Sequence, residues 1–288
     1  MKYLNYLLQA IIVYISFLLI KILGINISRK IFIRIFRVIG PLVRTNKIVV
    51  SNIYRIYDTI DEGGMKKIID EMWSNYAITF VEYVYLKKFN SQQNHIQIKN
   101  KEILEKIVNS KKPVIFISGH FSNFELMAME LHKSKIKLSA IYRPLNNIFL
   151  NPFMEMLRKK FICPNQIKKG VTGLKDAIND LRKGHSLALM IDQRLSEGEK
   201  IKFFGDDAKT TTLPAQLALK FNLLIVPIFL ERKENFSYEL EVFQPLNFEG
   251  LENNNDNKTK ITKELNNWLE KAVKKNPGQW ILTHNRWK

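Results

Sequence analysis

The sequence predicts an α/β protein with a largely parallel mixed sheet flanked by helices, preceded by a membrane-anchor helix and basic interfacial helices. Three observations support this fold class. After about residue 90, short apolar runs alternate with amphipathic stretches, which is typical of strands alternating with helices. Residues 3–20 contain no charged side chain. Residues 27–57 then interleave seven Lys and Arg residues with Ile, Phe, Val and Tyr.

The uncharged run 3–20 would form a helix about 27 Å long, close to the hydrocarbon thickness of a bilayer. Asn5, Gln9 and Ser16 dilute the run and make it a marginal span. No small-residue cleavage pattern follows it, so the sequence favours an uncleaved anchor over a secretory signal. A buried core helix is the alternative, although the run has little polar face to present to water.

The segment 27–57 is predicted to lie on a membrane surface, with its cations at anionic lipid and its apolar side chains in the interface. Positive charge after the anchor predicts that the body of the protein is cytoplasmic. DNA could bind the same cations, but the sequence contains no helix-turn-helix, zinc-finger or RNP pattern. A net charge of +18, from 45 Lys and Arg against 27 Asp and Glu, indicates anionic partners.

The remaining elements follow in order from the hydrophobic pattern. An aromatic-rich helix is expected first, and then strands and helices alternate. The division into domains is 1–24 for the anchor, 25–90 for a basic and aromatic interfacial helical region, and 91–288 for the α/β domain. The expected strands are 114–117, 138–142, 187–191, 223–230 and an edge strand at 238–243, and the expected helices are 65–88, 124–132, 148–160, 174–183, 213–221 and 258–275.

Several chemical classes are excluded by their missing motifs. Cys163 is the only cysteine, so the chain cannot form an internal disulfide, and the five His are scattered. The sequence has no C-x-x-C or H-E-x-x-H pattern for a metal, no P-loop and no G-x-S-x-G elbow. We therefore expect no metal and no organic cofactor.

One group of polar residues follows the expected strand 114–117 directly, where α/β sheets place their ligands. His120 and Glu125 are five residues apart, about 140° on a regular helix. They can meet only if His120 stays in the turn and Glu125 begins the next helix. Glu125 would then accept the proton of one imidazole nitrogen and leave the other nitrogen as a base. The alternative is a capping box, in which Ser122 and Glu125 hold the end of the helix.

Charged residues also follow the next two strands of the pattern. Arg143 comes after the strand 138–142, and Asp192 and Arg194 come after the strand 187–191. A single arginine at a strand end is often a solvated surface residue. Their repeated occurrence at one predicted sheet edge is what indicates a site.

Several short motifs occur in order along the chain. They are Gly119-His120-Phe121-Ser122-Asn123-Phe124-Glu125, Tyr142-Arg143-Pro144 with Asn147, Asp192-Gln193, Phe203-Phe204-Gly205 with the Thr run 210–212, Pro277-Gly278-Gln279-Trp280 and His284-x-Arg286-Trp287. In these motifs the sequence resembles the late acyltransferases of lipid A biosynthesis, within the wider glycerolipid acyltransferase superfamily. The resemblance covers nearly the whole chain.

The resemblance implies a role for each candidate residue. His120 would be the general base, Glu125 would orient it, Arg143 and Arg158 would hold phosphate or the oxyanion, and Asp192 would line the site. Arg194 is counted among the substrate-binding residues, although it departs from the family's pattern.

The resemblance implies transfer of a fatty acyl group from acyl carrier protein, or from acyl-CoA, to a hydroxyl of a lipid A precursor without an acyl-enzyme. Both an acidic carrier protein and an anionic lipid suit a +18 enzyme on the cytoplasmic face of a bacterial inner membrane. Two alternatives stay open. One is acylation of another lipid, such as a glycolipid, an aminolipid or a lysophospholipid, and the other is an inactive membrane-associated lipid-binding protein. No binding of nucleic acid is expected.

Overall fold

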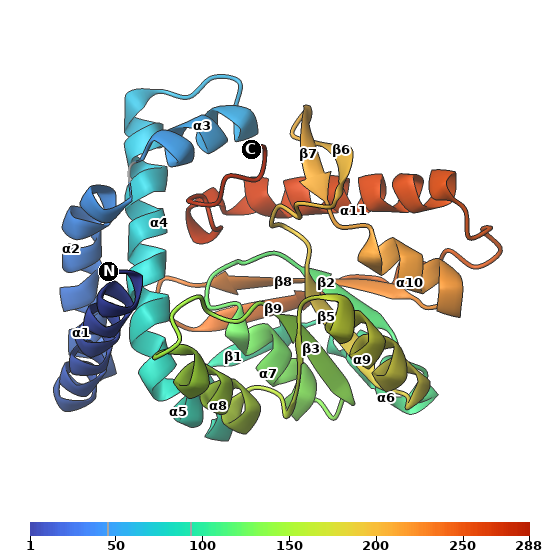
Figure 1. The fold of residues 1–288 in the computed structure, drawn as a ribbon, viewed down its shortest axis with the longest axis horizontal. Coiled ribbons are helices and arrows are strands. Elements are labelled where there is room, and N and C mark those ends of the chain that lie inside the picture. The colour runs from blue at the N-terminus through green and yellow to red at the C-terminus, as the bar shows by residue number, and fades with distance from the viewer. Residues whose placement is uncertain (45, 93) are drawn as a thin grey trace.

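A mostly parallel sheet forms the centre of the protein (Figure 1). In this computed structural model, which describes residues 1–44, 46–92 and 94–288, seven strands join in the order β1-β9-β8-β2-β5-β3-β4. Strands β8 and β9 are antiparallel, and the other neighbouring pairs are parallel, which confirms the predicted fold class. A separate antiparallel hairpin consists of β6 and β7. The strands are β1 Ile96–Lys99, β2 Ile115–Ser118, β3 Leu138–Tyr142, β4 Asn165–Lys168, β5 Ser186–Met190, β6 Glu199–Phe203, β7 Asp206–Thr210, β8 Ile225–Arg232 and β9 Tyr238–Val242.

The helices cover both faces of the sheet. The chain crosses the sheet in one direction through β2-α7-β3-α8-β4 and returns through β4-α9-β5 and α10-β8. Right-handed crossovers therefore put α7 and α8 on one face and α9 and α10 on the other. The helices are α1 Lys2–Leu23, α2 Ile25–Val43, α3 Lys47–Ile56, α4 Glu62–Glu82, α5 Leu86–Ser91, α6 Lys101–Ser110, α7 Glu125–Lys133, α8 Asn151–Phe161, α9 Val171–Arg182, α10 Leu213–Phe221 and α11 Asn255–Lys275, with 3-10 turns η1 Tyr83–Tyr85 and η2 Pro277–Gln279.

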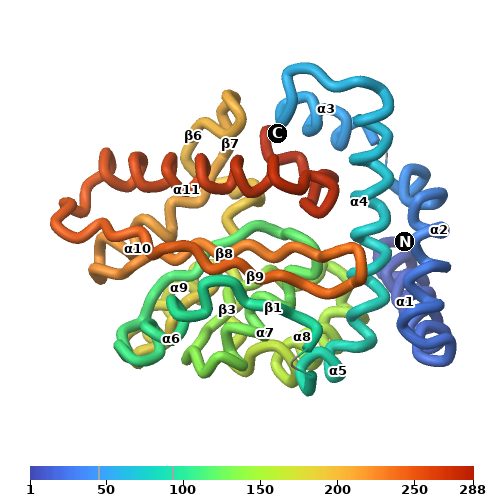
Figure 2. The backbone as a smooth tube through the Cα atoms, turned by 180° about the vertical axis from the view of Figure 1, so that it is seen from behind, coloured from blue at the N-terminus to red at the C-terminus, as the bar shows by residue number. Residues whose placement is uncertain are grey.

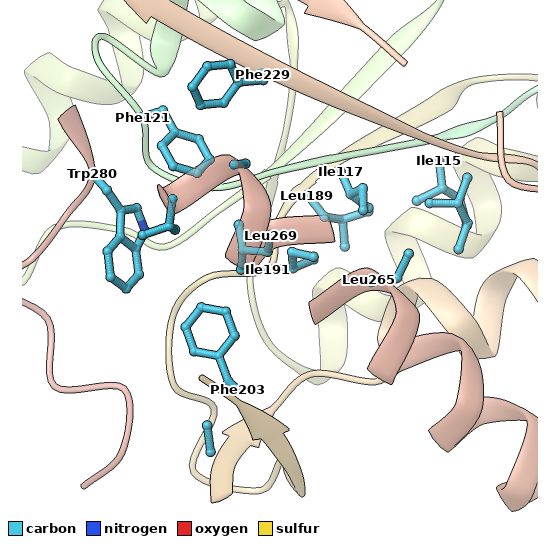
Figure 3. Packing of buried hydrophobic residues seen from close by; sticks show 14 of the residues in the cluster. Ile115, Ile117, Phe121, Leu189, Ile191, Phe203, Phe229, Leu265, Leu269 and Trp280 are labelled. Carbon is cyan, nitrogen blue, oxygen red and sulfur yellow. The ribbon is translucent and has the colours of Figure 1, made fainter. Parts of the chain in front are cut away.

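Alternation along the central strands builds two cores. In β2, Ile115 and Ile117 join the core under α9, α10 and α11, whereas Phe116 joins the core under α6, α7 and α8. All four residues of β2 are buried, as expected for a central parallel strand. Figure 3 shows the first core, to which Leu189 of β5 and Leu269 of α11 both belong. The buried apolar area on both faces fixes the position of the strand ends that carry the site.

Helices α1 and α2 lie outside α4, on the side away from the sheet (Figures 1 and 2). Helices α1 and α2 meet at Gly24, whose φ of 79° ends α1 and suits glycine. Of the residues described in α1, only Ala10 and Ile20 are buried, so α1 is not a core helix. By length and composition, α1 could cross a membrane.

The prediction that the cations of residues 27–57 all face a membrane is wrong for two of them. Arg29 is buried in α2 and forms an ion pair with Glu82 of α4 at 2.6 Å. Arg55 forms an ion pair with Asp206 at 2.9 Å and lies over the ring of Trp287. The rest of α2 keeps the expected pattern, because exposed apolar residues stand beside exposed cations along it.

Other differences concern the edges of the sheet. The strand at 238–243 is not an edge strand, because β9 lies between β8 and β1, and β1 is the edge. The strands β1, β4, β6 and β7 and the helix α6 were not expected, since they are short and mostly polar. The long helix expected at 65–88 ends at Glu82 and continues as η1 and α5. The boundary near residue 90 stays a prediction, although one core contains both Met72 and Trp280.

Candidate active site

The site lies at the carboxyl edge of the sheet, in the loop that follows β2. In the parallel register of β2 and β5, Ser118 is opposite Met190. The chain runs on for two residues beyond the end of each strand, and the same offset brings His120 next to Asp192. Strand order therefore determines which acid meets the histidine. The polar groups lie together at this edge of the sheet, as predicted. This is the edge at which α/β folds place their ligand sites.

His120 and Asp192 form a polar pair that is joined by two contacts. His120 Nδ1 and Asp192 Oδ1 are 2.7 Å apart, and the backbone N–H of His120 donates to Asp192 Oδ2 at 2.7 Å. Trp280 Nε1–H also donates to Oδ2, at 2.9 Å. These contacts fix both the carboxylate and the plane of the imidazole, and they leave Nε2 of His120 without a hydrogen-bond partner among the described residues.

Asp192 is fully buried and ionised. Burial by itself raises the pKa of this carboxyl, but the charge of His120 and the hydrogen bonds from His120 and Trp280 outweigh burial and lower the pKa to about 2. In the neutral form of His120, an ionised Asp192 keeps the proton on Nδ1, so Nε2 carries the lone pair. The imidazole side chain is 17% exposed, which leaves Nε2 reachable from outside.

Gly119 makes the close approach possible. A Cβ on residue 119 would lie 2.8 Å from Phe121 Cε2, 3.1 Å from Leu269 Cδ1 and 3.2 Å from Asp192 Oδ2. Any side chain there would push against the core on one side and against the carboxylate on the other. Glycine is therefore required by the packing of the turn and not by its φ angle.

Glu125 does not orient His120 in the structure. Its Oε1 accepts from Arg158 Nε at 2.8 Å and Nη2 at 2.6 Å, and from Tyr83 Oη at 2.6 Å. The predicted His120–Glu125 hydrogen bond is wrong in this geometry, because residue 125 begins α7 and its side chain turns toward α8 and η1. Burial, followed by the charge of Glu125, raises the pKa of the Tyr83 hydroxyl, so Tyr83 remains a donor.

The capping-box alternative for Glu125 is wrong as well. The residue before α7 is Phe124, and no side chain caps this helix end. The Ser122 hydroxyl instead donates to Gln279 and accepts from the backbone N–H of Arg232. Ser122 has a φ of 49°, and its backbone is held from outside the loop, by Gln279 O. The loop is thus shaped by tertiary contacts, which a local motif cannot reveal.

The three predicted arginines have different environments. Arg158 is 8% exposed and lies over the Tyr142 ring, so it is a buried partner of Glu125 and not a free surface cation. Arg143 is exposed and has no hydrogen bond or ion pair within the described part of the chain. Arg194 is half-buried, and its backbone N–H donates to His284 Nε2 at 2.9 Å. Of the three predicted arginines, Arg143 is therefore the one with an exposed side chain.

A buried polar network behind the loop was missed by sequence reasoning. We call it the Glu82 network: Glu82, Arg29, Asn123, Arg232 and Tyr238. Glu82 is fully buried; its Oε1 accepts from Arg29, and its Oε2 accepts from the Asn123 amide at 2.9 Å, from Arg232 at 3.4 Å and from the Tyr238 hydroxyl. The network connects α2, α4, β8 and β9 to the residue after Ser122. The available signal was an acid inside the aromatic-rich helix expected at 65–88, because an acid among apolar residues needs buried partners.

His284 gives the site a pH-dependent contribution to stability. Burial is the main cause that lowers the pKa of His284 to about 4. Nearby Arg286, His120 and Arg44 also lower this pKa, whereas the charge of Asp192 raises it. The folded protein therefore keeps His284 neutral, as the acceptor for Arg194 N–H. Between pH 6.5 and 4 the unfolded chain binds more protons at this residue, so we expect the free energy of unfolding to fall as pH falls through this range.

Thermal melts at constant ionic strength measure this effect. The His284→Gln variant should show a smaller loss of melting temperature between pH 6.5 and 4 than the wild type. His132→Gln, at an exposed position on α7, is the matched control and should follow the wild type. Equal slopes for wild type and His284→Gln would contradict the neutral, buried His284.

Within the described residues, no group of three or more His, Cys, Asp or Glu side chains is placed to hold a metal ion.

A family model described as bacterial lipid A biosynthesis acyltransferase matches residues 1–288. A curated relative, lipid A biosynthesis acyltransferase 2 from Shigella flexneri, is 26% identical over 222 residues, which cover 74% of this chain and 68% of the relative. The similarity therefore extends over the N-terminal helices as well as the sheet.

Proposed function

Because the chain belongs to the family of bacterial lipid A biosynthesis acyltransferases, as its motifs predicted, we propose that it transfers a fatty acyl group from a thioester to a hydroxyl of a lipid A precursor. Family membership supports acyl transfer in lipid A biosynthesis. The thioester donor, the hydroxyl acceptor and the roles of individual residues are our proposal. The observation that supports them most is the His120–Asp192 pair, with Nε2 of His120 unoccupied at the carboxyl edge of the sheet.

In the proposed reaction, His120 Nε2 takes the proton of the acceptor hydroxyl while the oxygen attacks the thioester carbonyl. The tetrahedral intermediate then collapses, the C–S bond breaks, and the imidazolium returns its proton to the departing thiolate. An ester and a free thiol are formed, so atoms and charges balance without an acyl-enzyme. Asp192 holds the imidazole in the right tautomer and stabilises the imidazolium, without taking the proton itself. No step of this reaction requires a cofactor.

The charge distribution supports the proposed partners. A net charge of +18 favours approach of an acidic acyl carrier protein, or of acyl-CoA, and of an anionic acceptor. The apolar α1 and the basic α2 favour attachment to a membrane, which we propose to be the cytoplasmic face of a bacterial inner membrane. We assign no role in nucleic-acid binding to the cations.

The proposal is tested with purified protein in lipid nanodiscs, acyl carrier protein charged with a fatty acid, and a phosphorylated lipid A precursor. Mass spectrometry should show the precursor gaining one acyl chain, in step with the release of one thiol. Mild alkaline hydroxylamine should remove the new chain if it is an ester. Thiol release without an acylated lipid, or an acylated lipid other than the precursor in mixed extracts, would overturn the proposed acceptor.

Arg143 is proposed to hold an anionic group of a substrate. Arg143→Ala should lower kcat/KM by about 10- to 100-fold, the range for loss of a charge-assisted hydrogen bond. Arg143→Lys should recover only part of the loss if the contact is bidentate. The melting temperature should not change, because an exposed, unpaired cation contributes little to folding. Arg182→Ala removes an exposed cation at the opposite edge of the sheet and is the matched control; equal kinetics for the two variants would rule out this role.

A further inference from the structure

Helix α1 contacts the body of the protein along its whole length. Near its start, the carbonyl of Tyr6 accepts a hydrogen bond from Asn147 Nδ2 at 2.8 Å. In its middle, Tyr14 Oη donates to the carbonyl of Phe149 at 2.8 Å. At its end, the carbonyl of Ile20 accepts from Tyr85 Oη at 3.0 Å. The helix is therefore attached at three levels and does not extend away from the sheet domain.

The attached residues recur at helical spacing. Ala10 and Ile20 are buried, and the ring of Phe17 packs against Phe80 and Phe153 with centroids 5.1 and 6.1 Å apart. One stripe of α1 is thus used for contact with the body. The opposite half of the helix is exposed and apolar: Leu4, Leu7, Leu8, Ile11, Ile12, Ile15, Leu18, Leu19 and Ile22.

Two neighbouring segments continue this exposed apolar surface. The loop between β3 and α8, held against α1 by Asn147, exposes 39% of Leu145 and 51% of Ile148. Helix α2, which Ser28 ties to the carbonyl of Ile20, exposes apolar side chains next to cations. We call the combined surface the lipid face: the exposed half of α1, Leu145, Ile148 and Phe149 of the loop, and Ile27, Ile31, Ile35, Val38 and Leu42 of α2 with Lys30, Arg34 and Arg37.

A perpendicular orientation of α1 conflicts with these attachments. The helix is about 33 Å long, so in a spanning orientation its first half would lie in the leaflet farther from Gly24. Asn147 of the loop 143–150 is hydrogen-bonded to that half at Tyr6, so the loop would have to follow it. The loop consists of irregular backbone and carries the exposed Arg143. Irregular lipid-exposed backbone and unpaired charges are not found in the hydrocarbon region.

We infer that α1 lies in the plane of the membrane surface and does not cross the bilayer, and that the whole lipid face enters a single leaflet. The partner is a bilayer with anionic headgroups, because cations border the apolar residues on α2. The inference rests on the membrane attachment in the proposed function, and it is independent of the acyl-transfer chemistry. It puts Arg143, which follows β3 at the loop, at the level of the headgroups.

Spin labels measure the depth of α1 directly. Leu4→Cys, Ile11→Cys and Ile22→Cys place a nitroxide at the start, middle and end of the exposed half, in a chain whose single Cys163 is fully buried. In vesicles of phosphatidylethanolamine and phosphatidylglycerol, all three labels and one at Ile148 should report the same shallow depth by power saturation. Leu251→Cys, an exposed apolar position outside the lipid face, should report water. A label at Ile11 deeper than both Leu4 and Ile22 would show that α1 spans the bilayer.

A sidedness measurement gives an independent result. In sealed inside-out inner-membrane vesicles, an impermeant maleimide should modify both Lys2→Cys and Lys30→Cys, and in right-side-out vesicles it should modify neither. Modification of Lys2→Cys only in right-side-out vesicles would overturn the inference.

Vesicle partition tests the lipid face itself. Ile148→Asp should weaken the partition of the protein into vesicles about tenfold, whereas Leu251→Asp should not. If the wild-type protein did not bind vesicles, the assignment of the lipid face would be overturned. Acyl transfer to a detergent-dispersed precursor would still test the proposed chemistry.

Discussion

Replacing His120 with Ala should lower the rate of acyl transfer by ~10²–10⁴-fold, the usual contribution of a general base. The variant should still fold, because the imidazole is partly exposed and the loop is held by Ser122 and Asn123. Transfer is measured as the acylated lipid product, with the melting temperature as the folding control. Added imidazole should restore part of the rate, because it can occupy the space left by the side chain. A His120→Ala protein with the wild-type rate would overturn the proposed base.

The variant Asp192→Asn tests whether Asp192 or Glu125 orients His120. An amide cannot stabilise the imidazolium, and its N–H₂ can point at Nδ1 and favour the wrong tautomer, so the rate should fall to nearly that of His120→Ala. Glu125→Gln is the matched comparison. Because Glu125 contacts Arg158 and Tyr83 and not His120, Glu125→Gln should act mainly on stability. A severe loss of rate in Glu125→Gln with a normal melting temperature, and normal turnover in Asp192→Asn, would return the orienting role to Glu125.

Arg158→Ala should cost about 3–5 kcal/mol of folding free energy, the range for removing one partner of a buried ion pair. Among the donors in the described part of the chain, the buried carboxylate of Glu125 would then keep only the Tyr83 hydroxyl. This differs from the role that the resemblance implied for Arg158, which was to hold phosphate or the oxyanion. Denaturant melts in detergent measure the effect at constant protein concentration.

The double variant Glu125→Leu with Arg158→Met is the control for this prediction. Removing both charges together should recover much of the loss, since no uncompensated charge stays buried. A melting temperature for Arg158→Ala within a degree of the wild type would show that the pair is solvated, and would make Arg158 available again as an anion-binding residue.

The fold was largely predictable because the central strands are continuous apolar runs bounded by turn residues. The strand at 138–142 and the helix at 213–221 have the predicted bounds. The short segments β1 and β4, and the hairpin β6–β7 with residues such as Asp206 and Lys209, were not predictable. Their pairing depends on neighbours distant in the sequence, and their own pattern is polar.

The position of the site was predictable, but its pairings were not. The sequence puts His120 and Asp192 at the same edge of the sheet. The order β2-β5-β3, which makes them neighbours, is set by packing on both faces of the sheet. Glu125 was favoured as the partner because it is close in sequence, yet the first turn of α7 directs it to Arg158. Arg29 was assigned to the membrane for a similar reason, since helical periodicity does not show which cation faces an acid on another helix.

The Glu82 network has a consequence for how the protein opens. Arg29 is the one described donor to Oε1 of Glu82, so if α2 lifted from the body, that buried oxygen would lose its hydrogen bond. The same carboxylate holds Asn123 of the loop that carries His120. Although α2 is at the periphery, we expect its detachment and the loosening of the loop that carries His120 to be linked in free energy. Local unfolding that begins at α2 should therefore extend through α4 to this loop.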